Sequence, residues 1–215
     1  MLELTNNVVK LIYARCPEYS INSAYYIDGY VTVENFGFDK NIIIHYTYDC
    51  ESWLTCSASY ITDAKENHEI WYFRTPSTND HSACNFAICY KTNDKEYWDN
   101  NQNKNYKLKW YSPTKILQSC NIIIDKVFKS STAFYGNILV KNLAYHKKVR
   151  VRYSFDNWQN SSEWDAIYSQ EIVNRLELWK FYIPLTFYCE IKFNICYIVE
   201  GITYSDNNFG MNYSI

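Results

Sequence analysis

The feature that most limits how this 215-residue chain can fold is an internal repeat at a spacing of 107 residues. The stretch EYWDNNQNKNY at 96–106 nearly recurs as TYSDNNFGMNY at 203–213. Around it, residues 88–108 match residues 195–215 at nine of 21 positions. This period is far longer than the roughly 20 to 50 residues of a solenoid unit, so the repeat predicts two copies of one whole domain.

Two further blocks keep nearly the same spacing. The sequence that begins at Gly29 returns from Gly136, and EIWYFRTP at 69–76 returns as ELWKFYIP at 177–184. The spacing changes by only a residue or two between blocks, which is what insertions in loops produce. The similarity therefore covers most of each copy.

The length fits two domains of about 105 residues each, a usual size for an independently folding unit. The segment KWYSPTKILQS at 109–119 carries the proline expected of a linker. We expect the division near residue 112, with copy one at 1–112 and copy two at 113–215.

The composition is that of a globular protein, with 47% hydrophobic and 20% charged residues. A formal net charge of −2 argues against nucleic acid as a partner, because nucleic-acid-binding domains usually carry a basic surplus. No stretch approaches 18 apolar residues, so we expect no membrane span, and the start resembles no signal peptide. The expected location is cytoplasmic, or secreted if the chain is a fragment. Only Cys89 and Cys196 recur among eight cysteines, which indicates free thiols rather than a disulfide framework.

Short segments rich in Val, Ile and Tyr, partly alternating with polar residues, predict half-buried strands. They lie at 8–14, 30–36, 42–48, 69–74 and 84–91, with counterparts in copy two that include 121–127, 177–183 and 190–199. No segment shows sustained helical periodicity. The pattern predicts an all-β protein of antiparallel sandwiches. Trp71 and Trp179 alternate with apolar residues in one such strand pair, which favours a place in the core.

The repeated DNN stretch has the composition of a turn, since Asp and Asn side chains bond nearby backbone and tolerate left-handed conformations. A turn does not explain the second asparagine, Asn105 in copy one and Asn212 in copy two. An amide beside an aromatic ring suits a sugar, which offers an apolar C–H face and a rim of hydroxyl groups.

In one register, VKNLAYHKK, FDNW and YSDNN resemble the family 21 carbohydrate-binding module. This family includes the starch-binding domain of fungal glucoamylase and the glycogen-binding domain of the glycogen-targeting subunits of protein phosphatase 1. The resemblance covers nearly all of both copies. It implies two immunoglobulin-like antiparallel β-sandwiches in tandem, binding of α-1,4-glucan, and no catalysis.

The resemblance also implies two aromatic binding sites in each copy. At the first, the Trp that follows the aspartate matches Trp53 and Trp158, and the aromatic before DNN matches Trp98. Copy two has Ser205 at the position of Trp98, so we expect its first site to be the weaker.

The second site of the family uses an exposed loop aromatic, matched by Phe38 and Tyr145, and a downstream aromatic, matched by Tyr60 and Tyr168. The expected polar ligands are Asn100, Asn101, Asn105, Asn207, Asn208 and Asn212.

No nucleophile elbow, metal-ligand spacing or phosphate loop is present, so we expect no enzyme activity, no metal and no cofactor. The alternative to a free glucan-binding protein is a scaffold that brings the catalytic subunit of protein phosphatase 1 to glycogen. Its docking motif has a basic residue, Val or Ile, any residue, then Phe or Trp. The nearest match, at 150–153, ends in Tyr and lies in a predicted strand. The sequence leaves open whether the glucan is starch or glycogen, and whether a catalytic partner such as an amylase exists.

Overall fold

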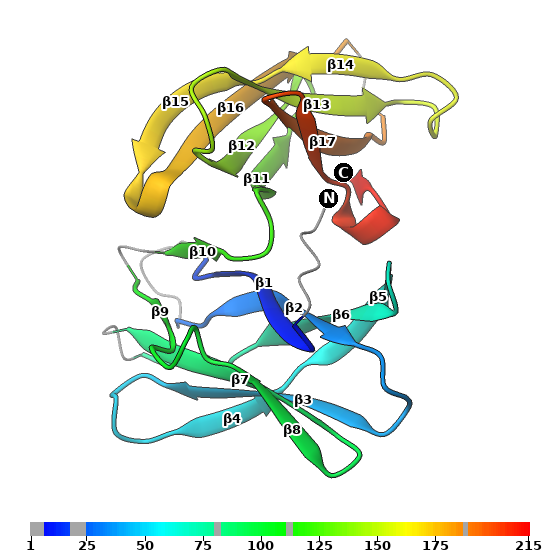
Figure 1. Ribbon diagram of the computed structural model, residues 1–215. Coiled ribbons are helices and arrows are strands. Elements are labelled where there is room, and N and C mark those ends of the chain that lie inside the picture. Colours follow the sequence, from blue (N-terminus) through cyan, green and yellow to red (C-terminus); the bar gives the residue numbers. More distant parts are fainter. Residues whose placement is uncertain (1–6, 18–24, 80–82, 111–113, 187–188) are drawn as a thin grey trace. The chain divides into compact units, whose positions relative to one another are not determined.

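The computed structural model describes residues 7–17, 25–79, 83–110, 114–186 and 189–215. Contacts group these residues in two units, here called the first module, which ends at Ser119, and the second module, from Cys120 to Ile215 (Figure 1). Each module is described by itself.

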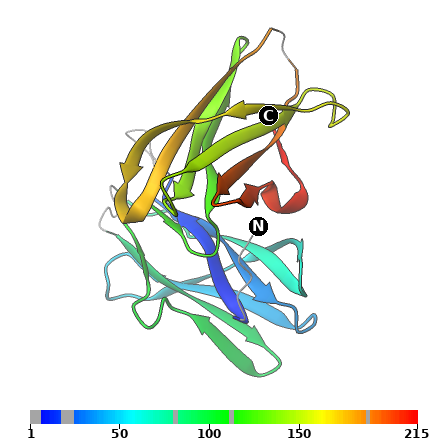
Figure 2. The same ribbon diagram turned by 45° about the horizontal axis from the view of Figure 1, so that its top comes forward.

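The first module consists of two antiparallel sheets that face each other as layers (Figures 1 and 2). One sheet has the strand order β10-β1-β2-β6-β5, and the other has the order β4-β3-β7-β8 with β9 also paired to β7. The strands are β1 (Val9–Arg15), β2 (Asp28–Glu34), β3 (Lys40–Thr47), β4 (Leu54–Ser57), β5 (Ser59–Ala64), β6 (His68–Arg74), β7 (Cys84–Thr92), β8 (Lys95–Asp99), β9 (Tyr106–Leu108) and β10 (Lys115–Leu117).

The second module repeats this plan with the orders β11-β12-β16-β15 and β14-β13-β17-β18, and β19 pairs with β17. Its strands are β11 (Ile122–Lys129), β12 (Ala133–Lys141), β13 (Lys147–Ser154), β14 (Ser162–Asp165), β15 (Ile167–Ile172), β16 (Leu176–Pro184), β17 (Lys192–Val199), β18 (Ile202–Asp206) and β19 (Tyr213–Ser214). Two single-turn 3-10 helices, η1 (Val173–Arg175) and η2 (Asn208–Gly210), are the only helices in the described ranges. The prediction of two all-β antiparallel sandwiches is confirmed.

Each module buries its own apolar core between its two sheets. In β3 the inward side chains Ile42, Ile44 and Tyr46 are almost fully buried, as the alternation in the sequence predicts. In the second module, the ring of Phe134 packs 5.0 Å from that of Phe181 and 4.8 Å from that of Phe193. Each such side chain contributes about 1.5–3 kcal/mol through burial, so each module has the means to fold by itself.

The repeated glycine marks a close approach of two strands. A Cβ at Gly29 would lie 2.5 Å from the carbonyl oxygen of Tyr13 and 2.8 Å from the ring of Phe73. The β1–β2 register shifts beside it, between Leu11 and Tyr13, and the extra residue pushes the backbone of β1 toward Gly29. Gly136 has the same role against β11. Both copies therefore need glycine at this point.

The segment expected to be a linker supplies an edge strand to the first module. β10 pairs with β1, with Leu117 opposite Tyr13 and Lys115 opposite Arg15. The hydroxyl of Ser119 donates to the carbonyl oxygen of Leu11 at 2.7 Å. The division near residue 112 stays a prediction, and the contacts of β10 associate residues 115–119 with the first module.

Candidate carbohydrate-binding sites

The aspartate of the first DNN stretch ties its loop to the opposite sheet. Asp99 is buried at the end of β8 and accepts hydrogen bonds from the backbone N–H of Leu11 (2.7 Å) and from the hydroxyl of Tyr106 (2.8 Å). Burial, together with the adjacent Asp99 carboxylate, raises the pKa of Tyr106, so this phenol stays protonated and remains a donor.

The second module reproduces this arrangement. Asp206 accepts from the backbone N–H of Ile124 at 3.0 Å and from the hydroxyl of Tyr213 at 2.8 Å. Burial raises the pKa of Asp206, whereas these hydrogen bonds favour its carboxylate form. The Asp and Tyr of the repeated stretch thus recur because they join the loop to the first strand of each module.

The second asparagine recurs for a backbone reason. Asn105 and Asn212 have φ angles of 55° and 57°, in the left-handed region that asparagine tolerates better than most residues. Their carbonyl oxygens accept hydrogen bonds from the side-chain amides of Asn101 (3.1 Å) and Asn208 (3.2 Å). In each module this pair of asparagines therefore stabilises the conformation of the loop.

The remaining predicted asparagines also bond within their loops. The amide of Asn100 donates to Asn103 at 3.0 Å, and the side-chain oxygen of Asn207 accepts from the backbone N–H of Gly210 at 3.0 Å. A loop fixed in this way holds its unused donors and acceptors in place. The role of these asparagines as sugar ligands stays a prediction.

Two tryptophans of the predicted first site are half-exposed on one sheet of the first module. Trp53 precedes β4 and Trp98 lies in β8, and each exposes 47% of its surface. Among the described residues no ring contact joins them, and β3 and β7 lie between β4, which follows Trp53, and β8.

His45 is the residue of this surface that the sequence did not single out. Its ring on β3 lies 4.9 Å from that of Trp98. Its Nε2 atom is buried and has no hydrogen-bond partner in the described part of the chain. Burial, and then the charge of Lys91, lowers the pKa of His45. A repeated histidine would have drawn attention to it, but the second module has Arg152 at the equivalent position of β13.

Hydrogen bonds to the carboxylate of Asp49 hold the loop that leads to Trp53. Asp49 accepts from the hydroxyl of Thr47 (2.8 Å) and from the backbone N–H groups of Glu51 (2.9 Å) and Ser52 (2.8 Å). These bonds, the one from Ser52 first, lower the pKa of Asp49 well below its usual range. The loop is thus fixed before any ligand arrives.

Trp158 has a different setting in the second module. It is partly buried and less exposed than Trp53, its φ angle is 70°, and its indole Nε1 is buried without a partner among the described residues. Its backbone N–H donates to the hydroxyl of Ser154 at 2.9 Å, and the guanidinium of Arg152 lies 5.7 Å from the ring centre. With Ser205 in place of a second aromatic, this surface offers less ring area than that of the first module.

The predicted second site begins with the two most exposed aromatic side chains among the described residues. Phe38, in the loop between β2 and β3, is 105% exposed, and Tyr145, in the equivalent loop of the second module, is 90% exposed. An apolar ring that stays in solvent at the tip of a loop contributes no burial free energy to folding. Such a position suits contact with a ligand.

The downstream aromatics of this site form the same ring pair in both modules. Tyr60 packs edge to face against Trp71 at 5.8 Å and 80°, and Tyr168 packs against Trp179 at 5.8 Å and 80°. The tyrosines are 48% and 49% exposed, whereas the tryptophans are partly buried against their cores. Trp71 and Trp179 thus link the core, where they were expected, to the exposed tyrosines.

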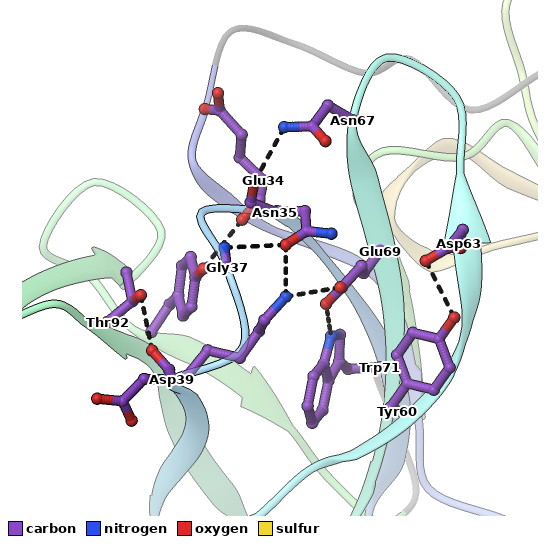
Figure 3. Close-up of polar contacts among 12 residues, drawn as sticks. Glu34, Asn35, Gly37, Asp39, Tyr60, Asp63, Asn67, Glu69, Trp71 and Thr92 are labelled. Atoms are coloured by element: carbon purple, nitrogen blue, oxygen red, sulfur yellow. Dashed lines mark hydrogen bonds and ion pairs between the residues drawn. The ribbon is translucent and has the colours of Figure 1, made fainter.

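A buried ion pair connects this ring pair to the loop of Phe38 (Figure 3). Lys40 donates through Nζ to Glu69 at 2.6 Å and to the side-chain oxygen of Asn35 at 2.7 Å, and both charged side chains are only 7% exposed. The second carboxylate oxygen of Glu69 accepts from Nε1 of Trp71 at 2.9 Å. Asn35 also accepts from the backbone N–H of Gly37 at 3.0 Å, so one network fixes both halves of the site.

The second module has the same polar network. Lys147 donates to Glu177 and to Asn142 at 2.6 Å each, and Glu177 accepts from Nε1 of Trp179 at 2.9 Å. These charged residues were not predicted from the sequence. The recurrence of Glu two positions before Trp, in EIW and ELW, was the available signal.

In the described residues, no three His, Cys, Asp or Glu side chains are grouped so as to hold a metal ion. No helix there is both long and apolar enough to span a bilayer.

Two β-sandwiches with exposed aromatic side chains over a fixed polar network have the form of carbohydrate-binding modules. The chain belongs to family 21 of these modules: the family model described as carbohydrate/starch-binding module (family 21) matches residues 4–109 and 116–215. The resemblance noted in the sequence is thereby confirmed for both copies.

The chain is similar to protein phosphatase 1 regulatory subunit 3B of Xenopus tropicalis, at 28% identity over 105 residues, 46% of this chain and 35% of that protein. It is 38% identical over 108 residues to glucoamylase 1 of Rhizopus oryzae, covering 48% of this chain and 18% of that protein. The matched part thus spans about a third or less of these relatives.

Two solved structures show similarity to one module each. One is the starch-binding domain of Rhizopus oryzae glucoamylase in complex with β-cyclodextrin and maltoheptaose, with 36% identity, 46% of this chain, 96% of that chain and a TM-score of 0.42. The other is the carbohydrate-binding module of the muscle glycogen-targeting subunit of protein phosphatase 1, with 27% identity, 44% of this chain, 73% of that chain and a TM-score of 0.38.

Proposed function

We propose that both modules bind α-1,4-glucan, as starch or glycogen, through their exposed aromatic side chains, and that the chain does not cleave the polymer. The observation that carries this proposal is the ring pair of Tyr60 and Trp71, repeated with the same 5.8 Å separation and 80° angle by Tyr168 and Trp179. A half-exposed tyrosine ring that packs on a tryptophan beneath it presents an apolar face and a hydroxyl group to a ligand.

The residues of each site have distinct roles in this proposal. Trp53 and Trp98 form the main platform of the first site, and Trp158 alone forms its weaker equivalent. Phe38 with Tyr60, and Tyr145 with Tyr168, form the second sites. The asparagine loops offer the donors and acceptors that their internal hydrogen bonds leave unused to the hydroxyl groups of the sugar.

The relatives support the ligand class. The solved glucoamylase domain holds β-cyclodextrin and maltoheptaose, and the second solved relative is a module of a glycogen-targeting subunit. The family matches cover residues 4–109 and 116–215, which supports binding without catalysis as the role of this chain.

Sedimentation with insoluble polysaccharides tests the proposal. The protein should pellet with amylose and bind glycogen, and it should stay in solution with cellulose and chitin, whose β-linked chains have a different shape. Pure protein should release no reducing sugar from soluble starch. Pelleting with cellulose or chitin but not with amylose would refute the proposed ligand, and released sugar would refute the absence of catalysis.

A second candidate function is a scaffold for the catalytic subunit of protein phosphatase 1, favoured by the names of several relatives. The sequence at 150–153 does not support docking there. Val151 is fully buried, and its strand β13 pairs with β14 on one side and β17 on the other. Retention of the purified catalytic subunit by the immobilised chain would support this candidate. The cytoplasmic location expected from the sequence belongs with it and stays a prediction.

A further inference from the structure

A row of exposed aromatic rings crosses the outer face of one sheet in the second module, and none of its residues belongs to a predicted site. Phe128 on β11, Tyr135 on β12 and Tyr182 on β16 are direct neighbours across the strands. Their ring centres are 5.5 Å and 6.0 Å apart, with interplanar angles of 24° and 27°. They expose 48%, 38% and 58% of their surfaces, so the row does not belong to the core.

The fold does not require aromatic residues at this place. The row of the same register in the first module adjoins Gly29 as this one adjoins Gly136, and it holds Arg15, Asp28 and Arg74. There Arg15 and Asp28 form an ion pair at 2.9 Å. At this register the first module thus has charges. Its own row of rings, Tyr13, Tyr30 and Tyr72, lies two residues along on the same face, at ring separations of 5.3 Å and 5.2 Å, where the second module has Lys126, Asn137 and Lys180.

Polar side chains border the aromatic row on the same face. Lys126, Asn137 and Lys180 lie two residues along each strand, and alternate residues share a face of a sheet. Lys180 is exposed and Asn137 is half-buried. The exposed ammonium group of Lys180 and the amide of Asn137, beside a line of rings, offer hydrogen bonds to hydroxyl groups at the rim of a ligand that stacks on the rings.

We propose that this face, formed by Phe128, Tyr135 and Tyr182 with the bordering Lys–Asn–Lys row, is a further glucan-binding surface that contacts long chains. The proposal rests on the proposed glucan binding of the modules. A sugar chain has the two properties that the face matches, an apolar ring face and a rim of hydroxyl groups. Single-stranded nucleic acid also stacks on aromatic rows, but proteins that bind it carry a basic groove, and this chain has a net charge of −2.

The test uses the full chain and two measurements. Hydroxyl-radical footprinting with mass spectrometry should show that long-chain amylose protects the rings of Tyr135 and Tyr182 from oxidation. Tyr182→Ala should weaken amylose binding by at least about fivefold, as loss of one stacking platform does. Tyr182→Phe should keep most of the affinity. Ile202→Ala is the matched control, because Ile202 is an apolar residue with 53% exposure on β18 of the other sheet, and it should bind as the parent protein does.

Several outcomes would overturn the inference. If the protein pellets with amylose while Tyr135 and Tyr182 react as fast as before, glucan binding stands and this face is not part of it. If Tyr182→Ala lowers only the melting temperature, the row has a structural role alone. Protection by a thymidine oligonucleotide and not by amylose would assign the face to nucleic acid. If the protein fails to pellet with amylose at all, the proposed function fails, and this inference fails with it.

Discussion

Trp53 and Trp158 occupy matching places in the sequence but have different surroundings in the structure. Trp53 is 47% exposed and its loop is held by Asp49, whereas the indole nitrogen of Trp158 is buried. Trp53→Ala should therefore remove a binding platform and leave the fold intact. We expect a loss of about 1–3 kcal/mol, roughly 5- to 150-fold in affinity at that site, by analogy with bases that stack on aromatic side chains.

Calorimetric titration with β-cyclodextrin measures this difference, and Trp158→Ala should have the smaller effect. Circular dichroism of both variants provides the control for folding. Equal losses, or a loss only in Trp158→Ala, would contradict the assignment. If Trp53→Ala unfolds the first module, Trp53 is a packing residue and not a platform.

His45 gives the first module a pH dependence that the second module lacks at this position. Its pKa lies below the ordinary 6.5 in the folded protein because of burial. The unfolded chain thus takes up a proton near pH 6.5 that the folded chain does not yet bind. The contribution of His45 to the free energy of unfolding is complete above pH 6.5 and is lost as the pH falls toward the folded pKa.

Urea unfolding at a series of pH values, for the parent protein and for His45→Gln, measures this contribution. The parent protein should lose more stability between pH 7 and pH 5 than the variant does. A titration of the His45 ring by NMR with a midpoint at or above 6.5 would refute the prediction.

At the scale of elements, the buried pair of Lys40 and Glu69 holds β3 to β6 and supports the second site. Removal of one charge from a buried pair leaves the other without compensation and costs about 3–5 kcal/mol. Lys40→Met should therefore destabilise the first module by about this amount, measured by urea unfolding. The double variant Lys40→Met with Glu69→Leu should recover much of that loss.

Binding measurements on the double variant show whether this network positions the second site or only stabilises the module. In the double variant Trp71 loses the acceptor of its indole N–H, and the loop of Phe38 loses a contact to Asn35. Affinity for β-cyclodextrin at the second site should stay low although stability returns. Full recovery of binding together with stability would show that this network does not position the site.

The pairing of edge strand β10 with β1 leads to a prediction about truncated forms of the first module. Its Leu117 is largely buried and Ser119 bonds to Leu11, so residues 1–119 should be more stable than residues 1–112 by about 1–3 kcal/mol. Both fragments should unfold cooperatively with a β-type circular dichroism spectrum, because each keeps the two sheets of the first module. Equal melting temperatures would show that β10 adds nothing, and a helical or molten fragment would contradict an independent module.

The sequence predicted the strands that have one buried and one exposed face, because burial on one face imposes alternation. It did not predict the strands β4, β5, β14 and β15, whose residues are mostly exposed on both faces and show no such pattern. The aromatic residues of the site were identified through the family pattern. Lys40 and Glu69 were missed, because a charged residue is normally exposed and sequence does not reveal that two of them meet in a buried pair.

At the scale of the whole molecule, two linked modules should bind a polymer more tightly than either does alone. If both engage one glucan, linkage raises affinity by roughly 10²- to 10⁴-fold over a single site. The double variant Tyr145→Ala with Tyr168→Ala should therefore lose much more affinity for amylose than for β-cyclodextrin, which is too small to reach two modules. Sedimentation and calorimetry measure the two losses. Equal losses on the two ligands would mean that the modules bind independently.

The two different rows beside Gly29 and Gly136 have a practical consequence for protein engineering. One sheet scaffold accepts Arg15, Asp28 and Arg74 in one copy and three aromatic residues in the other. The two copies thus differ in the side chains on this surface, whereas the core beneath it has the same form in both. A designer who wishes to graft a new specificity onto this scaffold can begin at these three positions and leave the glycine beside them unchanged.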